Sequence, residues 1–430
     1  MNTPLLILNF IIFAIVIISF IAKNVDYLTI SLLSAFLSAT ITGIILNIEM
    51  EVFLIHIEWK AIIFIFFMSL ITIIAVDSNI LEYLTVKLFQ ITKGQQRIFF
   101  ISLILLTTVL AATINDVVVI IILAPVVIRI CHILKIRSGT YLAGMTLCVK
   151  IGSIITPFAS SENIIISTHF NLTTVYFIQN FWIVSFFLLF VSIFLMDRFI
   201  LKKEPVVDPQ QKKFMLELIN KDVLIKNKKM FYFNSVAIVI IVFLFIILPE
   251  LYLTAAISSL ILILINRKFT KISLHKMLKD IEWDIIFFLI SLYVIVGSIL
   301  ESGFGEIFNQ IPFETINPLF LYFILLITIS LMSAFVANTP TTLIFIPIIE
   351  TLINSGFSPE ILFTIFIFGI HLGGNMVPQG AAAHVTTLNI AERSGVSNLN
   401  YKRLLKVGFT LTIIQLLIIL GFVYILVLLN

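Results

Sequence analysis

The sequence has few charged residues for its length. Of its 430 residues, 12% are Asp, Glu, Lys or Arg and 60% are apolar, whereas soluble domains have about 25% charged and about 45–50% apolar residues. A soluble protein of this composition lacks the polar side chains that a globular surface needs. The composition therefore excludes a water-soluble enzyme, a nucleic-acid-binding protein and a disordered chain.

Cysteine is also scarce. Cys131 and Cys148 are the only two in the chain, and both lie in or beside apolar stretches, where cysteine is usually a small packing residue. The sequence has no Walker motif and no HExxH, DDxxD or Cys/His cluster, which argues against direct ATP drive and against an intramembrane enzyme. We therefore predict a protein that is not an enzyme and that needs no cofactor beyond a coupling ion.

Long apolar runs, in contrast, are abundant. One run includes Ser185–Met196 and another includes Phe233–Leu248. An apolar helix of about 20 residues crosses roughly 30 Å of hydrocarbon, so the predicted fold class is an all-α polytopic membrane protein. The first segment, Pro4–Ile21, lacks the positive leading region of a cleavable signal peptide and is predicted to be a permanent span.

The two halves of the chain share the spacing of several residues. Asn115 lies 56 residues after Trp59, and Asn338 lies 55 residues after Trp283. The prolines and glycines that follow each asparagine also agree in spacing within one residue. Agreement at several positions predicts two structural repeats within the chain.

We place these repeats, of about five spans each, at 1–200 and 232–430, with a basic linker at 201–231. Short loops rich in Lys and Arg stay in the cytoplasm, so loops 201–231 and 266–282 are predicted to be cytoplasmic, in a protein of the cytoplasmic membrane. The loop before Trp59 is acidic, whereas the matching basic loop precedes Trp283. The two repeats are therefore expected to have inverted topology.

Each repeat is predicted to contain a re-entrant helical hairpin. Residues 98–130 are apolar, with Asn115-Asp116 in the middle and basic residues at both ends. If both ends are cytoplasmic, the segment enters the membrane and returns. The matching hairpin is 318–353, with Asn338 at its tip. The alternative is four ordinary short crossings, which would place one basic end outside.

A broken helix is predicted to follow each hairpin, at 141–167 and at 361–390. Proline removes a backbone donor and glycine loosens a helix, and unpaired backbone at membrane depth is tolerated where it lines a cavity. The interruptions are expected at Gly152-Ser153 and Thr156-Pro157 in the first, and at Gly373-Gly374-Asn375 and Pro378-Gln379-Gly380 in the second.

A binding site is predicted near the membrane midplane, where the hairpin tips meet the helix breaks. The N-termini of half-helices suit an anion, and unwound carbonyls suit Na⁺ or a proton carrier. The predicted site residues are Asn115, Asp116, Lys150, Gly152, Thr156, Pro157, Glu162, Asn163, Asn338, Thr339, His371, Gly373, Asn375 and Pro378. The coupling ion is H⁺ or Na⁺, and a Na⁺ would lie near Asn115, Asp116 and Asn338.

Several of these residues have a structural alternative. Asn115 and Asn338 are good helix caps, and Asp116 can cap the returning arm of its hairpin. Lys150 can serve as the counter-ion of Asp116, or take part in transport itself. A histidine such as His371 is more often a hydrogen-bonded packing residue than a titrating group.

The paired motifs resemble those of the ion transporter superfamily. Asn115-Asp116 followed by Pro125, and Asn338-Thr339-Pro340 followed by Pro347, are similar to its hairpin-tip motifs. Gly152–Asn163 and Gly373–Ala383 are similar to its two helix-break motifs. This superfamily includes arsenite permeases, citrate-transporter-like proteins, sodium/proton antiporters, and sodium-coupled dicarboxylate and sulfate carriers. The resemblance covers nearly the whole chain.

The resemblance implies a scaffold that supports a moving transport domain, made of both hairpins and both broken helices. It implies a secondary active transporter for a small anion, an organic acid or a metalloid oxyacid of the arsenite or citrate type. A Na⁺/H⁺ antiporter of the same superfamily and, less favoured, an ion channel are the alternatives. The expected partners are a small-molecule or ion substrate and the lipid bilayer, with a homodimer as a further option.

Overall fold

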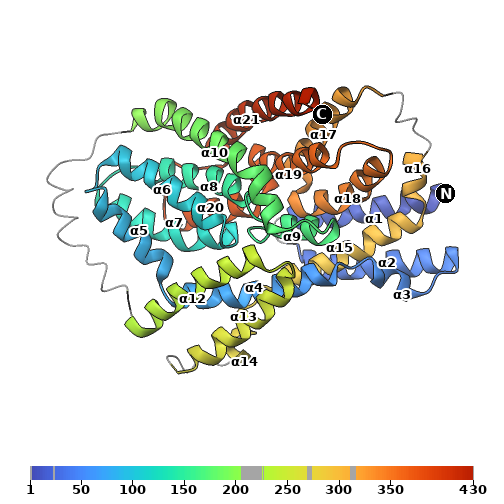
Figure 1. Ribbon diagram of the computed structural model, residues 1–430, viewed down its shortest axis with the longest axis horizontal. Helices are drawn as coiled ribbons and strands as arrows, with labels where there is room; N and C mark the ends of the chain where they lie inside the picture. Colours follow the sequence, from blue (N-terminus) through green and yellow to red (C-terminus); the bar gives the residue numbers. More distant parts are fainter. Residues whose placement is uncertain are drawn as a thin grey trace.

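The computed structural model describes residues 2–22, 25–204, 225, 227–268, 274–309 and 316–429. These residues form helices and connecting turns, without strands (Figure 1). Ten of the described helices are long and apolar enough to cross a membrane. The all-helical, multi-pass fold predicted from the composition is therefore confirmed. Residues 205–224 of the predicted linker and 269–273 of the predicted cytoplasmic loop lie outside the described residues.

The described part of the first half contains ten α-helices and a short 3-10 helix. They are α1 (Thr3–Ile21), α2 (Tyr27–Leu46), α3 (Met50–Ile55), α4 (Trp59–Asp77), α5 (Ile80–Ile91), α6 (Gln96–Ala111), α7 (Asp116–Ile133), α8 (Ser138–Ser153), α9 (Ser161–His169), α10 (Thr174–Phe199) and η1 (Leu201–Lys203).

The described part of the second half follows the same order. Its helices are α12 (Lys228–Ile247), α13 (Leu251–Asn266), α14 (Leu274–Met277), α15 (Trp283–Glu301), α16 (Phe304–Asn309), α17 (Pro318–Val336), α18 (Asn338–Asn354), α19 (Pro359–Met376), η4 (Pro378–Gly380), α20 (Ala382–Arg393) and α21 (Tyr401–Leu429).

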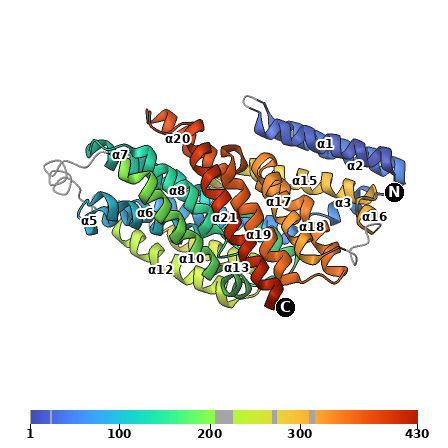
Figure 2. The same ribbon diagram turned by 90° about the horizontal axis from the view of Figure 1, so that it is seen from above.

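Helix packing follows the same plan in both halves. Helix α6 packs on α8 as α17 packs on α19, and α2 packs on α15 as α13 packs on α4. The halves also interlock, because α7 packs on α20 and α18 packs on α9. The α1–α2 and α12–α13 pairs lie at opposite edges of the molecule (Figure 2). Helices α4 and α15 lie between these two pairs and contact each other, and the hairpins and broken helices lie above this layer in Figure 1.

Two buried asparagines make matching contacts across the halves. On α1, the amide of Asn9 donates to the hydroxyl of Ser302, the C-cap of α15, at 2.9 Å. On α12, the amide of Asn234 donates to the hydroxyl of Ser78, the C-cap of α4, at 2.7 Å. Each helix pair is thereby tied to the long helix of the other half. This exchange supports the proposal of two repeats independently of residue spacing.

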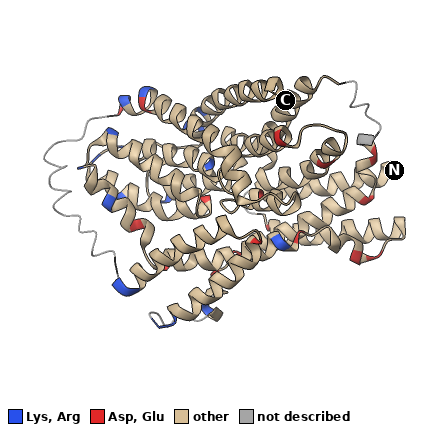
Figure 3. Ribbon diagram, in the orientation of Figure 1, with Lys and Arg blue, Asp and Glu red and all other residues tan. Residues whose placement is uncertain are grey.

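The charges are distributed unevenly along the molecule (Figure 3). Lys and Arg gather near the start of α6, the end of α10 and the start of α12, and the ends near α3 and α18 carry Asp and Glu. A basic side and an acidic side are what the preference of Lys and Arg for the cytoplasm produces. We therefore propose that the two repeats are inserted in opposite directions, as the loop charges predict.

The helix breaks differ from the prediction in one respect. The first broken helix is interrupted between α8 and α9, over residues 154–160, and the second between Met376 and Ala382. Gly152 and Ser153 were expected to interrupt the first helix, but they are the last two residues of α8. Gly373, Gly374 and Asn375 were expected to interrupt the second helix, but all three lie inside α19. Since its hydrogen bonds continue through Gly373, that glycine has a packing role, and the break begins at Val377.

That packing role is a close helix crossing. A methyl group on Gly373 would overlap the backbone carbonyl of Ser330 in α17, and one on Gly152 would overlap the carbonyl of Thr108 in α6. In each half, glycine therefore lets the helix before the break lie directly against the first arm of the hairpin.

Candidate functional site

A cavity of about 440 Å³ lies where the two hairpin tips and the two helix breaks meet. Its polar side includes Asn115, Asp116, Lys150, Ser160, Ser161, Glu162, Asn338 and Thr339. Its opposite side is mainly apolar and is formed by α4 and the start of α15, including Phe64, Met68, Phe288 and Leu289. Asp77, Asp280 and Glu282 lie on the same wall, at the end of α4 and before α15.

Four helices begin at this cavity. Its lining includes the N-terminal residues of α7, α9, α18 and α20. The first turn of a helix has backbone N–H groups without an intrahelical acceptor, and the helix dipole adds partial positive charge there. Because α7 and α18 come from the two hairpins, and α9 and α20 from the two breaks, the tertiary structure gathers the four ends predicted to form the site.

The helix ends of the first half are capped by the protein's own side chains. Asn115 Oδ1 accepts from the backbone N–H of Val117 at 3.0 Å, and Asp116 Oδ1 accepts from the same group at 2.8 Å. Ser160 Oγ accepts from the N–H of Asn163 at 3.3 Å. Asn115 thus has the capping role that was its structural alternative, and it also faces the cavity.

The helix ends of the second half are uncapped in the described structure: neither α18 nor α20 has a side-chain cap. Asn338 Oδ1 accepts from Ser333 Oγ at 2.8 Å, whereas its buried Nδ2 has no hydrogen-bond partner among the described residues. Leaving a buried donor unpaired costs about 1–3 kcal/mol. This half of the cavity therefore offers hydrogen-bond donors to a solute.

Ala337 precedes Asn338 in a strained backbone conformation. Its φ of 80° and ψ of 160° lie in a region that is essentially restricted to glycine and costs about 1–3 kcal/mol for other residues. The alanine lines the cavity at the tip of the second hairpin. Such strain is typical of sites where the surrounding structure fixes the backbone for binding.

Asp116 and Lys150 form a buried ion pair. Lys150 Nζ lies 2.6 Å from Asp116 Oδ2, and the two side chains are 3% and 4% exposed. Asp116 begins α7, and Lys150 comes from the last turn of α8, so the pair joins the hairpin tip to the broken helix. Glu162, on α9, is buried and interacts electrostatically with Lys150. The lysine is thus the counter-ion of Asp116.

Three other predicted residues join the broken helices and do not line the cavity. Asn163 Nδ2 donates to the carbonyls of Ser153 and Thr156, at 2.6 and 3.0 Å. Its Oδ1 lies 2.8 Å from His371 Nε2, and Asn375 Nδ2 donates to the carbonyl of Leu147 at 3.0 Å. These bonds satisfy carbonyls freed by the first break and connect α19 to α8. The residues that were predicted but lie outside the cavity lining are Gly152, Thr156, Pro157, Asn163, His371, Gly373, Asn375 and Pro378.

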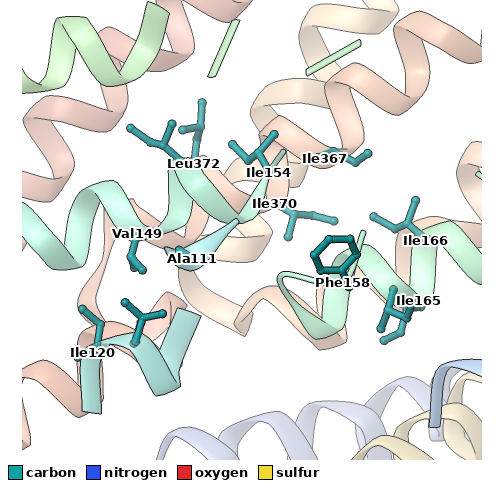
Figure 4. Packing of buried hydrophobic residues seen from close by; sticks show 14 of the residues in the cluster. Ala111, Ile120, Val149, Ile154, Phe158, Ile165, Ile166, Ile367, Ile370 and Leu372 are labelled. Atoms are coloured by element: carbon teal, nitrogen blue, oxygen red, sulfur yellow. The ribbon is translucent and has the colours of Figure 1, made fainter. Parts of the chain in front are cut away.

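The surroundings of this polar bridge are apolar. Figure 4 shows Val149 and Ile154 near the end of α8, with Ile370 and Leu372 on α19 close by. All four are fully buried. Hydrogen bonds in apolar surroundings are costly to break, so the bridge is expected to hold the two broken helices as one rigid unit.

Other cavity residues were not predicted. Ser160 and Ser161 lie in the polar stretch before α9, and Ser161 Oγ is 3.4 Å from Thr339 Oγ1 across the two halves. Their polarity within a membrane-depth segment was the available signal. The contributions of α4 and α15 had no sequence signal, because both are ordinary apolar spans.

A comparison with protein families identifies the chain. Residues 13–369 match the model of the CitMHS family, described as "Citrate transporter". The chain belongs to this family. It is therefore a multi-pass membrane transporter, and the resemblance seen in the tip and break motifs is confirmed.

Its relatives are described only in general terms. The 46 kDa membrane protein of Mycobacterium leprae is 22% identical over 386 residues, which are 86% of this chain and 87% of that protein. An uncharacterized transporter of Synechocystis sp. is 28% identical over 165 residues, 34% of this chain and 36% of that protein. The second match thus spans well under two thirds of either protein.

A solved structure has the same fold. The YdaH transporter of Alcanivorax borkumensis, whose crystal structure reveals an unusual topology, superposes with a TM-score of 0.58. The match covers 85% of this chain and 84% of the YdaH chain, at 13% sequence identity. At this sequence identity, the comparison establishes only the fold of this citrate transporter family member.

A charged contact on the far side of α9 gives a pH-dependent prediction. His169 ends α9, outside the candidate spans, and its ring nitrogens lie 2.9 Å from Glu58 Oε1 and 3.5 Å from Glu350 Oε2. Burial lowers the pKa of His169, but the hydrogen bond and charge of Glu58, with Glu350, outweigh it and raise the pKa above its usual 6.5.

A raised pKa means that protonated His169 stabilises the folded protein. This stabilisation is complete below about pH 6.5 and is lost as the pH rises through the raised pKa. We expect His169→Gln to lower the free energy of unfolding by on the order of 1 kcal/mol in mildly acidic buffer, and to have little effect in alkaline buffer. Equal effects at both ends of a pH series would contradict this assignment.

Proposed function

We propose that this citrate transporter family member is a secondary active transporter of a small anion, an organic acid or a metalloid oxyacid. Transport would be coupled to H⁺ or Na⁺ and would take place across the cytoplasmic membrane. The observation that supports the proposal most is the meeting of four helix N-termini at one buried cavity. Such ends bind anions and oxygen-rich solutes without a dedicated cationic side chain.

The second half of the cavity is the better place for the solute. Its two helix ends are uncapped, and the Asn338 amide is buried with a free donor. In the first half, Asp116 and Glu162 stand at the equivalent helix ends and would repel an anion. We therefore place the carboxylate or oxyacid group at the tips of α18 and α20.

The shape of the cavity supports an elevator-like movement. The polar lining belongs to the hairpins and broken helices, whereas the apolar wall belongs to α4 and α15. An apolar wall makes few directional bonds, so the polar unit can slide along it with its solute. Asp280 and Glu282, which border the cavity, belong to the loop predicted to be cytoplasmic, so the described conformation would face inward.

A Na⁺/H⁺ antiporter is the second candidate. On the polar side of the cavity, the two carboxylates of Asp116 and Glu162 outnumber the single lysine. This excess of negative charge favours a cation as the transported ion, whereas the helix N-termini favour an anion. Transport assays with the purified protein in liposomes, under imposed ion gradients, distinguish the two functions. Uptake of arsenite, citrate, succinate or sulfate supports the first, and Na⁺/H⁺ exchange without any of these solutes supports the second.

Asn338→Ala is expected to abolish solute uptake, with at least a tenfold loss, while the protein still folds. The variant removes a buried donor that has no partner among the described residues, so it costs little stability but would remove a hydrogen bond to the solute. Asn180→Ala is the matched control, because Asn180 is an exposed residue of α10 with a local backbone bond. If Asn338→Ala took up solute at the wild-type rate, the proposed position of the solute at this helix end would be wrong.

A further inference from the structure

We propose that the Lys150 ammonium is a built-in cation that occupies the position of a coupling metal ion at the first hairpin tip. Wild-type protein then binds no Na⁺ between Asp116 and Glu162, and removing the Lys150 side chain opens a site there for a small cation. The inference rests on the proposed transport function and narrows its choice of coupling ion.

The geometry begins with two carboxylates in nearly the same situation. Asp116 is the first residue of α7 and Glu162 the second residue of α9; both are buried and both line the cavity. A carboxylate buried at membrane depth needs a neutralising partner. The space between two such helix ends is therefore a cation position.

The ammonium group of Lys150, which comes from the last turn of α8, occupies that position. Its Nζ is 2.6 Å from Asp116 Oδ2, its side chain is 3% exposed, and Glu162 adds to the negative field around it. Among the described residues, no group of three or more His, Cys, Asp or Glu side chains is arranged to hold a metal ion. The ammonium thus supplies the positive charge that a bound Na⁺ would supply.

The second half of the protein lacks all three charges. Its equivalents of Asp116, Lys150 and Glu162 are Thr339, His371 and Ala383. The lysine and the two carboxylates therefore form one set that is present in one repeat only.

The same geometry predicts what happens when the ammonium is removed. In Lys150→Ala, two buried carboxylates face a space vacated by a four-carbon chain and its charged end, with the cavity as an access route. A hydrated or partly dehydrated Na⁺, or methylammonium, matches the lost charge. Lys150→Arg keeps a tethered cation and provides the matched control.

The test is a thermal unfolding series of purified protein in detergent, with NaCl compared against N-methyl-D-glucamine chloride at equal ionic strength. We expect no Na⁺-specific shift for the wild type or Lys150→Arg. For Lys150→Ala we expect a melting temperature that rises by roughly 5 °C with Na⁺ or methylammonium. The double variant Asp116→Asn/Lys150→Ala should lose most of that response.

Two results would overturn the proposal. One is a Na⁺-specific stabilisation of the wild type that Asp116→Asn removes, since this would place a metal ion beside the lysine. The other is a failure of Lys150→Ala to respond to the cation: either its melting temperature does not rise with Na⁺ or methylammonium, or the variant does not fold whether Na⁺ is present or not. Because unfolding is measured without transport, absence of solute uptake by the wild type would count against the proposed function and leave this result standing.

Discussion

Lys150→Met is expected to destabilise the folded protein by about 5 kcal/mol in sodium-free buffer, the upper end of the range for breaking a buried ion pair. Methionine keeps the length and packing of the side chain but leaves Asp116 and Glu162 without a counter-ion. Both carboxylates are almost fully buried, so water solvates them too little to compensate for the lost charge. The measurement is unfolding by denaturant or heat of the purified protein.

The companion variants give the expected order of effects. Asp116→Ala should cost less, about 3 kcal/mol, because Glu162 still faces the lysine. Lys60→Met is the matched control: Lys60 is half-exposed and lies 4.0 Å from Glu250, and exposed pairs of this kind contribute about 1 kcal/mol or less. If Lys60→Met were as damaging as Lys150→Met, the cost would come from losing any lysine, and the burial argument would fail.

Gly373→Ala is the second variant with a large expected effect. The added methyl group would overlap the backbone carbonyl of Ser330 on α17. A backbone group in a packed helix cannot rotate away as a side chain can, so the helices must separate. We expect a loss of about 3 kcal/mol or more and loss of uptake, because α17 and α19 position the tip and the break.

Gly421→Ala is the control for this substitution. Gly421 lies within α21, and a methyl group there would meet no atom within 4 Å. Alanine is the better helix former by about 1 kcal/mol, so this variant should be neutral or stabilised. A tolerated Gly373→Ala, with normal uptake, would show that the crossing of α17 and α19 is looser than described.

Much of the architecture could be predicted from residue types and their spacing. Hairpin helices α6–α7 and α17–α18 lie within three residues of the predicted 98–130 and 318–353. The length of an apolar segment and the presence of polar residues at its middle are local properties of the sequence. An apolar segment in a bilayer must form a helix, because only its own backbone can satisfy its hydrogen bonds there. The ion pair of Asp116 and Lys150 was foreseeable as an alternative, since a lysine deep in an apolar helix needs a partner.

Proline and glycine gave a less complete prediction of the helix breaks. Pro157 and Pro378 mark both breaks, but Gly373 and Asn375 remain inside α19. A glycine that loosens a helix and a glycine that admits a close neighbour look the same in a sequence. Which role applies depends on whether another backbone crosses at that point, and here Ser330 does.

The sequence by itself determined that this protein is an all-helical membrane protein, and it gave the outer ends of the helix pairs α6–α7 and α17–α18 to within three residues. The tertiary structure decided which of the predicted site residues share a cavity: Asn115, Asp116, Lys150 and Asn338 do, whereas Asn163, His371 and Asn375 bond the broken helices together. The reason is that burial in a membrane depends on local apolarity, which a chain segment has on its own. The direction in which a buried side chain points depends on neighbours hundreds of residues away, which no local pattern contains.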